Sequence, residues 1–290
     1  MIKKILVTGA AGKTGRAVIQ ALASTGIPVR SLVYRDAQVS ETKVVGARET
    51  IVGDMRQAAV MNRAVEGVSL VYHICPNMSP YELEIGRHLV SAAAPAGVDR
   101  IVYHSVLHPQ IEAMPHHWTK LRVEEALFES EVGYTILQPA AYMQNILAGW
   151  ETMKERGEYV VPYSVDTRIG MVDLEDVAEA ARVVLTEPGH EWAIYELAGQ
   201  EILSQVDVAQ ILSRELSRPI KASSIPLKEW TAQARTAGLG EYQVNLLVRM
   251  FKYYEQYGFW GNSRVLAHLL GRKPGTFADF VRRAARERGF

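Results

Sequence analysis

Three glycines near the N-terminus have the spacing of a phosphate-binding turn. An apolar run over residues 5–7 leads into Gly9, Gly12 and Gly15, and residues 16–24 continue at helical spacing. A glycine turn between a strand and a helix brings backbone N–H groups and the positive end of the helix against a pyrophosphate. The sequence therefore predicts that a dinucleotide binds here.

Each glycine has its own expected role. The spacing G-x-x-G-x-x-G differs from the common pattern G-x-G-x-x-G. We expect Gly9 to allow the sharp turn, Gly12 to let the backbone approach the ligand, and Gly15 to let the helix pack tightly on the strand. The alternative is a glycine-rich turn without a ligand, but the strand before it and the helix after it favour a nucleotide.

The end of the second expected strand bears on which nucleotide binds. An NAD site usually places a carboxylate there, about 20 residues past the glycines, to hold the ribose 2′-OH. This chain has Tyr34 and Arg35, with Asp36 just beyond. A guanidinium can bind a phosphate through two hydrogen bonds, so Arg35 favours NADP(H) over NAD(H), and Lys13 would add positive charge. The alternatives are that both are solvated charges and that Arg35 pairs with Asp36.

The composition is that of an ordinary globular protein. The 290 residues are 48% hydrophobic, enough for one large α/β domain and a smaller lobe. The 32 basic and 32 acidic residues cancel, which argues against direct nucleic-acid binding. Cys75 is the single cysteine, so a reducing compartment is expected. We find no signal peptide and no apolar run of transmembrane length, and we expect a cytoplasmic protein without a membrane partner.

Strand and helix patterns alternate through the first half of the chain. This alternation predicts a doubly wound parallel sheet, the Rossmann class of α/β fold. The expected strands span 4–8, 29–34, 48–52, 70–75, 100–104 and 134–138. The expected helices span 15–23, 57–65, 81–94 and 119–130.

The second half is less regular and becomes mainly helical after Ser204. Before that point we expect a helix over 173–186, with Asp173 as its N-cap, and one more strand over 191–198. We expect the helical lobe, which is rich in aromatic residues, to fold over the carboxyl edge of the sheet, where ligands of such sheets bind.

These patterns suggest two lobes. The expected dinucleotide-binding domain covers 1–155 and 170–198, and the smaller substrate- or partner-binding lobe covers 156–169 and 199–290.

Further motifs follow in an order that resembles a known family. They are Gly53-Asp-Met55, the segments 100–110 and 119–127, the run 133–145, and the segments 170–178 and 270–280. Together with the glycine loop, they resemble the NmrA-like family of atypical short-chain dehydrogenases/reductases. The resemblance spans nearly the whole chain, and its motifs are much less specific to an activity than to the family.

The resemblance implies positions for several residues. Asp54 and Met55 would lie at the adenine, and residues 74–76 would border its ribose. Lys120 matches a lysine that points toward the nicotinamide ribose, and residues 139–145, which include Ala140 and Asn145, match the loop beside the nicotinamide. Without the family match, Asp54 reads as a turn residue and Lys120 as a solvated helix charge. The expected cofactor-binding residues are Gly9, Gly12, Lys13, Thr14, Gly15, Arg35, Asp54, Met55, Cys75, Lys120, Pro139 and Tyr142.

The catalytic pair of the short-chain dehydrogenases is incomplete in this chain. Those enzymes generally carry Tyr-x-x-x-Lys, in which the tyrosine transfers a proton and the ammonium lowers its pKa. Here His116 stands four residues before Lys120. Ser105 is present near the position of the strand-end serine, and the alternative alignment with the family places Val106 at that position. Lys120 and His116 are thus the candidate catalytic residues, and the alternative for His116 is a surface histidine in a loop.

Two other site classes find no support. The spacing of His104, His108, His116 and His117 fits no familiar set of metal ligands, so we expect no metal. No Gly-x-Ser-x-Gly motif occurs, which argues against a serine hydrolase.

Two functions remain. One is an NADPH-dependent oxidoreductase whose small acceptor, such as a quinone or dye, takes its proton from water and does without the tyrosine. The other is a non-catalytic redox sensor that binds NAD(P) and regulates a protein partner. We favour the enzyme because an ordered nicotinamide best explains Lys120. The identity of the acceptor or partner and the oligomeric state stay open.

Overall fold

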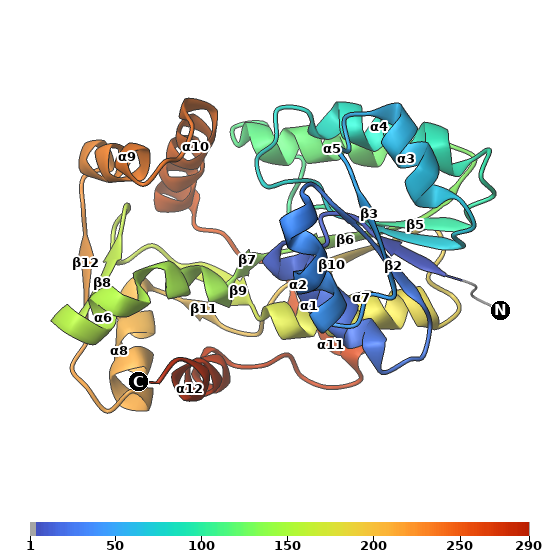
Figure 1. Cartoon of the computed structure of the whole chain (residues 1–290). Coiled ribbons are helices and arrows are strands. Elements are labelled where there is room, and N and C mark those ends of the chain that lie inside the picture. The colour runs from blue at the N-terminus through green and yellow to red at the C-terminus, as the bar shows by residue number, and fades with distance from the viewer. Residues whose placement is uncertain (1–3, 290) are drawn as a thin grey trace. The chain divides into compact units, whose positions relative to one another are not determined.

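A seven-stranded sheet carries the glycine loop at the end of one of its central strands. The computed structural model describes residues 4–289. The strands lie in the order β10-β6-β5-β4-β1-β2-β3 (Figure 1), and the pairings from β6 through β3 are parallel. Their bounds are β1 Ile5–Val7, β2 Val29–Val33, β3 Glu49–Val52, β4 Leu70–His73, β5 Arg100–His104, β6 Gly133–Pro139 and β10 Ala193–Leu197.

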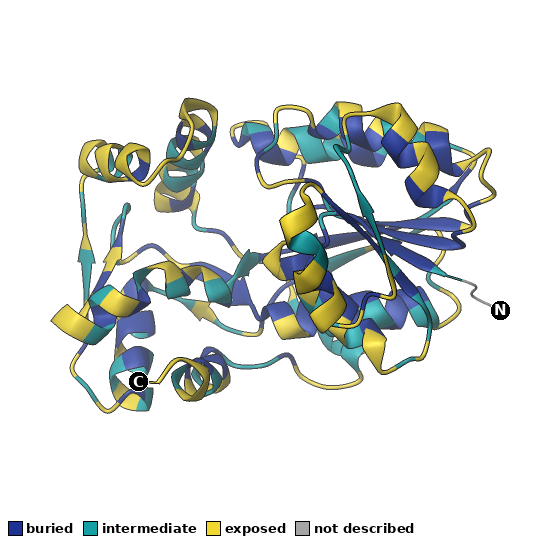
Figure 2. Ribbon diagram, viewed as in Figure 1, coloured by how far each residue is buried: buried dark blue, intermediate teal, exposed yellow. Residues whose placement is uncertain are grey.

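Helices cover both faces of this sheet, as expected for parallel strands joined by crossovers. Figure 2 shows that the outer faces of the helices are exposed, while the central strands β1, β4 and β5 are buried. Helix α1 buries Val18, Ile19 and Leu22, which recur at helical spacing, against the sheet. The helices are α1 Lys13–Ala23, α2 Val39–Val44, α3 Ala58–Val65, α4 Glu82–Ala93, α5 Pro115–Phe128 and α7 Leu174–Thr186, with a 3₁₀ turn η1 over Asp36–Gln38.

The chain divides into two compact units by its internal contacts. Among the described residues, unit 1 comprises 4–112, 116–138 and 177–195. Unit 2 comprises 113–115, 139–176 and 196–289. The glycine loop, Arg35 and Lys120 all belong to unit 1. The assignment of a dinucleotide to one lobe and a substrate or partner to the other stays a proposal.

Unit 2 contains short strands and most of the C-terminal helices. Strands β11 Ile202–Leu203, β9 Ile169–Val172 and β7 Ala141–Tyr142 form one small sheet, and β8 Glu158–Val161 pairs in parallel with β12 Lys221–Ser224. The helices are η2 Met143–Gly149, α6 Trp150–Arg156, α8 Gln205–Glu215, α9 Leu227–Thr236, α10 Glu241–Tyr257, α11 Ser263–Leu270 and α12 Phe277–Arg288.

The expected fold class is confirmed, and the first-half strands agree within three residues at each end. Asp173 is the N-cap of α7 as predicted, because its Oδ1 accepts a hydrogen bond from the Glu175 N–H at 3.1 Å. The short strands β7, β8, β9, β11 and β12 were not predicted. They are two to four residues long, so period-two alternation has little room to appear.

One prediction about α5 is wrong. The helix begins at Pro115 rather than near residue 119, so His116 and His117 lie in its first turn and not in a loop. Both are buried, with exposed fractions of 9% and 1%, so His116 is no surface histidine. Proline fits the first turn of a helix because its fixed φ suits the helix and its missing N–H has no partner there anyway.

Candidate functional site

The three glycines have the geometry of a phosphate cradle. Gly9 has φ +57°, and a Cβ there would lie 2.7 Å from the Ile74 carbonyl oxygen. A Cβ on Gly15 would lie 2.5 Å from the Gly9 oxygen and 2.7 Å from Ala10 Cα, so α1 packs directly on the turn. Both positions therefore require glycine for reasons internal to the fold.

Gly12 differs from the other two. It is the N-cap of α1 with φ −69°, a value open to any residue. A Cβ there would meet only the Gly9 oxygen, at 3.2 Å, and otherwise enters open space. That open space lies at the N-terminus of α1, where the backbone N–H groups of the first turn and the helix dipole attract an anion. The residues present therefore fit a pyrophosphate, with Lys13 and Thr14 in the first turn of the same helix.

Hydrogen bonds of Thr8 hold the start of the glycine loop against the end of β4. The Thr8 hydroxyl accepts from the Ile74 N–H at 2.9 Å and donates to the Ile74 carbonyl at 3.1 Å. His73 Nδ1 lies 2.8 Å from the same hydroxyl. Burial lowers the pKa of His73 to about 3, so this imidazole is neutral and serves the structure of the loop.

A turn at the end of β2, held by hydrogen bonds from its backbone to Gln38, exposes Arg35 to solvent. The Gln38 side-chain oxygen accepts from the N–H groups of Tyr34 at 3.1 Å and Arg35 at 3.0 Å. Arg35 is exposed and makes no ion pair with any of residues 4–289, so the alternative pairing with Asp36 is not formed there. A fixed backbone with a free guanidinium suits a 2′-phosphate.

Sequence reasoning missed the partner of Asp54. Its Oδ1 accepts from the Arg56 N–H at 2.9 Å, and its Oδ2 accepts from Arg56 Nε at 2.9 Å and from the terminal guanidinium nitrogen at 2.6 Å. The Arg56 guanidinium also lies 4.9 Å from the centre of the Tyr81 ring. The hydrogen bonds to Arg56 hold the pKa of Asp54 below its usual range. The expected contact of Asp54 with adenine stays a prediction, and Arg56 is its evident competitor.

Cys75 is buried and Met55 is half-buried. Cys75 is 5% exposed within the hydrophobic core of unit 1, and Met55 packs against the same core. Burial raises the pKa of the Cys75 thiol. Any contact of Cys75 with a nucleotide would therefore come from its backbone, whereas the half-buried Met55 side chain is still partly accessible.

Lys120 is held by a buried carboxylate that the sequence analysis did not select. Its Nζ donates to Glu82 Oε1 at 2.5 Å and to the His104 carbonyl at 3.3 Å. The Tyr103 hydroxyl donates to the same Glu82 oxygen at 2.9 Å. Glu82 stands in the first turn of α4, where an acidic residue is expected anyway because of the helix dipole, so its sequence position gave no signal of this role.

His116 lies one helical turn before Lys120 and is uncharged. Burial, with a smaller contribution from the Lys120 charge, lowers the pKa of His116 to about 4. Its Nδ1 is buried without a hydrogen-bond partner among the described residues. His116 is therefore a neutral imidazole at pH 7 and has no imidazolium proton to give.

Ser105 belongs to a buried network behind the strand end. It is 2% exposed, and its hydroxyl donates to Glu124. The Gln138 amide donates to both Glu124 oxygens, at 3.0 and 3.1 Å. Burial raises the pKa of Glu124. This network ties α5 to the strand ends β5 and β6 and leaves Ser105 unavailable for polarising a substrate.

Pro139 and Tyr142 lie in unit 2. Pro139 ends β6, and Tyr142 in β7 pairs with Val172 of β9. Gln144 fixes the following 3₁₀ helix, because its side chain donates to Asp173 at 2.7 Å and accepts from the Leu174 N–H at 3.1 Å. The expected position of Pro139 and Tyr142 beside the nicotinamide stays a prediction.

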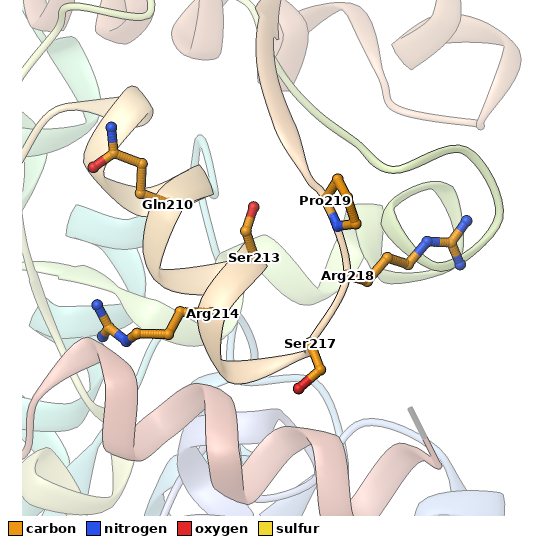
Figure 3. Close-up of a pocket in the computed structure, with 6 residues that line it drawn as sticks. All are labelled: Gln210, Ser213, Arg214, Ser217, Arg218 and Pro219. Carbon is orange, nitrogen blue, oxygen red and sulfur yellow. The ribbon is translucent and has the colours of Figure 1, made fainter.

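A shallow depression in unit 2 is not a candidate site. It is formed by α8 and the turn after it (Figure 3). Ser213 donates to backbone carbonyls at 2.8 and 2.9 Å, and the Arg218 guanidinium donates to the carbonyls of Lys154 and Glu155. These side chains are thus already engaged in holding the local fold. The depression is lined by Gln210, Ser213, Arg214, Ser217, Arg218 and Pro219.

No three histidine, cysteine, aspartate or glutamate side chains among residues 4–289 are grouped so as to hold a metal ion. No helix of the described part combines the length and apolar character needed to cross a bilayer.

The fold and the glycine cradle define a dinucleotide-binding protein of the Rossmann class. The model of the NmrA-like family matches residues 1–281, and the chain belongs to that family. It is 28% identical over 283 residues to the NAD(P)H azoreductase of Xenophilus azovorans, covering 96% of each chain. The expected family is thereby confirmed.

Two solved structures are similar over almost their whole length. One is the NADPH-dependent quinone oxidoreductase QOR2 of Escherichia coli in complex with NADPH, with TM-score 0.84, 25% identity and coverage of 97% of this chain and 99% of that one. The other is the triphenylmethane reductase of a Citrobacter species, with TM-score 0.85, 26% identity and coverage of 98% and 99%.

Proposed function

We propose that the protein is an NADPH-dependent oxidoreductase that reduces a small organic acceptor of the quinone or dye type. The observation that carries this proposal is Lys120. Two protein acceptors fix its ammonium at the end of β5, in a chain that also has the glycine cradle of α1. The relatives named for azo, quinone and triphenylmethane reduction support the acceptor class.

NADPH is the preferred cofactor in this proposal. The open space at Gly12 accommodates the pyrophosphate, and the unpaired guanidinium of Arg35 binds the 2′-phosphate. The Lys120 ammonium donates to a ribose hydroxyl of the nicotinamide half. When bound, the cofactor supplies the hydride, and the protein positions it and shapes its surroundings.

The surroundings of Lys120 favour acceptors that need no acid from the protein. His104 and His116 are neutral at pH 7, since burial lowers their pKa to about 3 and about 4. Tyr103 is fully buried and donates to Glu82. A quinone or dye can accept a hydride and then take a proton from water, whereas a simple ketone depends more on a positioned acid.

The decisive experiment is a calorimetric titration with NADPH and NADP⁺, followed by NADPH oxidation with a panel of quinones, azo dyes, triphenylmethane dyes and small ketones. We expect binding, and turnover with the first three classes. Binding that depends on the redox state of the cofactor, with no turnover across the panel, would instead identify the redox sensor.

A cytoplasmic location stays part of this proposal. It rests on the single cysteine and the expected use of NADPH. The oligomeric state would be measured in the same preparation by light scattering.

A further inference from the structure

We infer that Glu82 is a positioning residue that holds Lys120 for the nicotinamide half of the cofactor. The inference rests on the proposed function and adds to it a residue on α4, 38 positions away from Lys120 in the chain. Three features of unit 1 support it: the burial of Glu82, the way Lys120 is fixed, and the charge balance around the pair.

The first feature is that the Glu82 carboxylate is 2% exposed. Burying a carboxylate costs free energy unless charged and hydrogen-bonding groups compensate it. Two groups do so here, the Tyr103 hydroxyl at 2.9 Å and the Lys120 ammonium. An exposed acid at the start of α4 would serve the helix dipole equally well, so stabilising the helix does not account for the burial.

The second feature is that Lys120 is fixed but not enclosed. Its ammonium has three N–H donors. Glu82 and the His104 carbonyl take two, and the side chain packs over the Tyr103 ring with Nζ 5.4 Å from the ring centre. No third partner is found among residues 4–289, and the side chain is 16% exposed. One N–H is therefore left for a ligand, in a direction set by the other two contacts.

The third feature is the charge balance of the pair. Lys120 and Glu82 together carry no net charge, and His73, His104 and His116 beside them are neutral at pH 7. Lys120 therefore acts as an oriented hydrogen-bond donor rather than as an isolated cation. Without Glu82, the flexible Lys120 side chain must be ordered when the cofactor binds, and the entropy cost removes most of its contribution to the binding free energy.

The test is a pair of titrations on Glu82→Gln, which keeps the side-chain shape and removes the charge. NADPH reports on both halves of the site, and 2′,5′-ADP reports on the adenosine half alone. We expect Glu82→Gln to weaken NADPH binding by about tenfold or more, as for loss of a charged hydrogen bond, with the affinity for 2′,5′-ADP unchanged. Glu84→Gln, an exposed acid of the same helical turn, is the matched control and should leave both affinities unchanged.

A double variant separates positioning from a general structural role. If Glu82 acts through Lys120, adding Glu82→Gln to Lys120→Met should change NADPH affinity by less than about twofold further. Equal losses for NADPH and 2′,5′-ADP in Glu82→Gln, or wild-type NADPH affinity in that variant, would overturn the inference alone. Failure of the wild-type protein to bind NADPH would overturn the proposed function and the inference with it.

A second variant covers the case in which Glu82→Gln does not fold. Tyr103→Phe removes the other hydrogen bond of the carboxylate and leaves its charge in place. We expect a loss of about threefold in NADPH affinity with 2′,5′-ADP binding unchanged. The loss is smaller than for Glu82→Gln because the neutral hydrogen bond from Tyr103 is weaker than the charged one from Lys120. Unchanged NADPH affinity in a folded Tyr103→Phe protein would contradict the positioning role.

Discussion

The Asp54 carboxylate binds Arg56 with both of its oxygens, and the guanidinium so held lies over the ring of Tyr81. Asp54 and Tyr34 follow neighbouring parallel strands, in which Val52 pairs with Val33. Arg56 thus adds a fixed cation near the strand end that carries Arg35.

The first prediction concerns this cation. Arg56→Ala should weaken binding of 2′,5′-ADP by about three- to tenfold, because an exposed charge near a phosphate contributes modestly. Calorimetry on the variant measures the change, and Lys43→Ala in the neighbouring helix α2 is the control. An unchanged affinity would show that the Asp54–Arg56 ion pair does not contribute to binding of the adenosine half.

Selectivity between the two dinucleotides should depend on Arg35. Arg35→Ala should lose about 1.5–3 kcal/mol of NADPH affinity, the usual contribution of a charged hydrogen bond, and leave NADH nearly unchanged. Parallel titrations with the two cofactors measure the difference. Equal losses for both would remove Arg35 from the 2′-phosphate site.

Gly12 and Gly15 should respond differently to substitution. Gly12→Val is expected to fold normally, because φ is −69° and the side chain enters open space, and to lose NADPH binding because it fills the pyrophosphate site. Gly15→Val should instead destabilise the protein, since its Cβ would lie 2.5 Å from the Gly9 oxygen. Thermal unfolding and NADPH titration separate the two effects, and normal NADPH binding by Gly12→Val would mean that the loop is only a turn.

The roles of His116 and Lys120 can be separated by kinetics. Lys120→Ala should weaken NADPH binding and abolish reduction, whereas His116→Phe should reduce turnover by less than about tenfold, because a neutral imidazole is not the proton donor. Turnover should stay level between about pH 5.5 and 8, well above the His116 pKa of about 4. A loss of about 10²–10⁴ in His116→Phe with NADPH affinity intact would point to a carbonyl substrate, and unchanged activity in Lys120→Ala would remove the main support for the enzyme.

Acid should destabilise the fold through its buried histidines. Burial lowers the pKa of His73, His104 and His117 to about 3 and of His116 to about 4, from an ordinary value of 6.5. Between those values the unfolded chain binds more protons than the folded one, so the free energy of unfolding is highest above pH 6.5 and falls as the pH drops toward 4. Each histidine contributes up to about 1.4 kcal/mol per pH unit in this window. Urea titrations at several pH values test this, and a flat profile from pH 7 to 5 would show that the histidines titrate normally.

The sequence by itself determined the parts of the protein that local patterns control. Strand–helix alternation gave the sheet, and Gly9, Gly12 and Gly15 predicted the cradle, because a positive φ, an open approach and a tight packing contact each need glycine at a fixed spacing. Asp173 was found as an N-cap for the same reason, since a cap acts within its own helical turn.

Tertiary structure alone decided which polar groups meet. Glu82 and Lys120 are 38 residues apart in the sequence, and Ser105 and Glu124 are 19 residues apart. No sequence pattern specifies a contact over such separations. Burial likewise determines the charge of His116. Its residue type suggested a proton donor, but desolvation in α5 lowers its pKa and keeps the imidazole neutral. The sequence thus supplied the candidate side chains, and packing determined which are charged, which are held, and which remain able to bind a ligand.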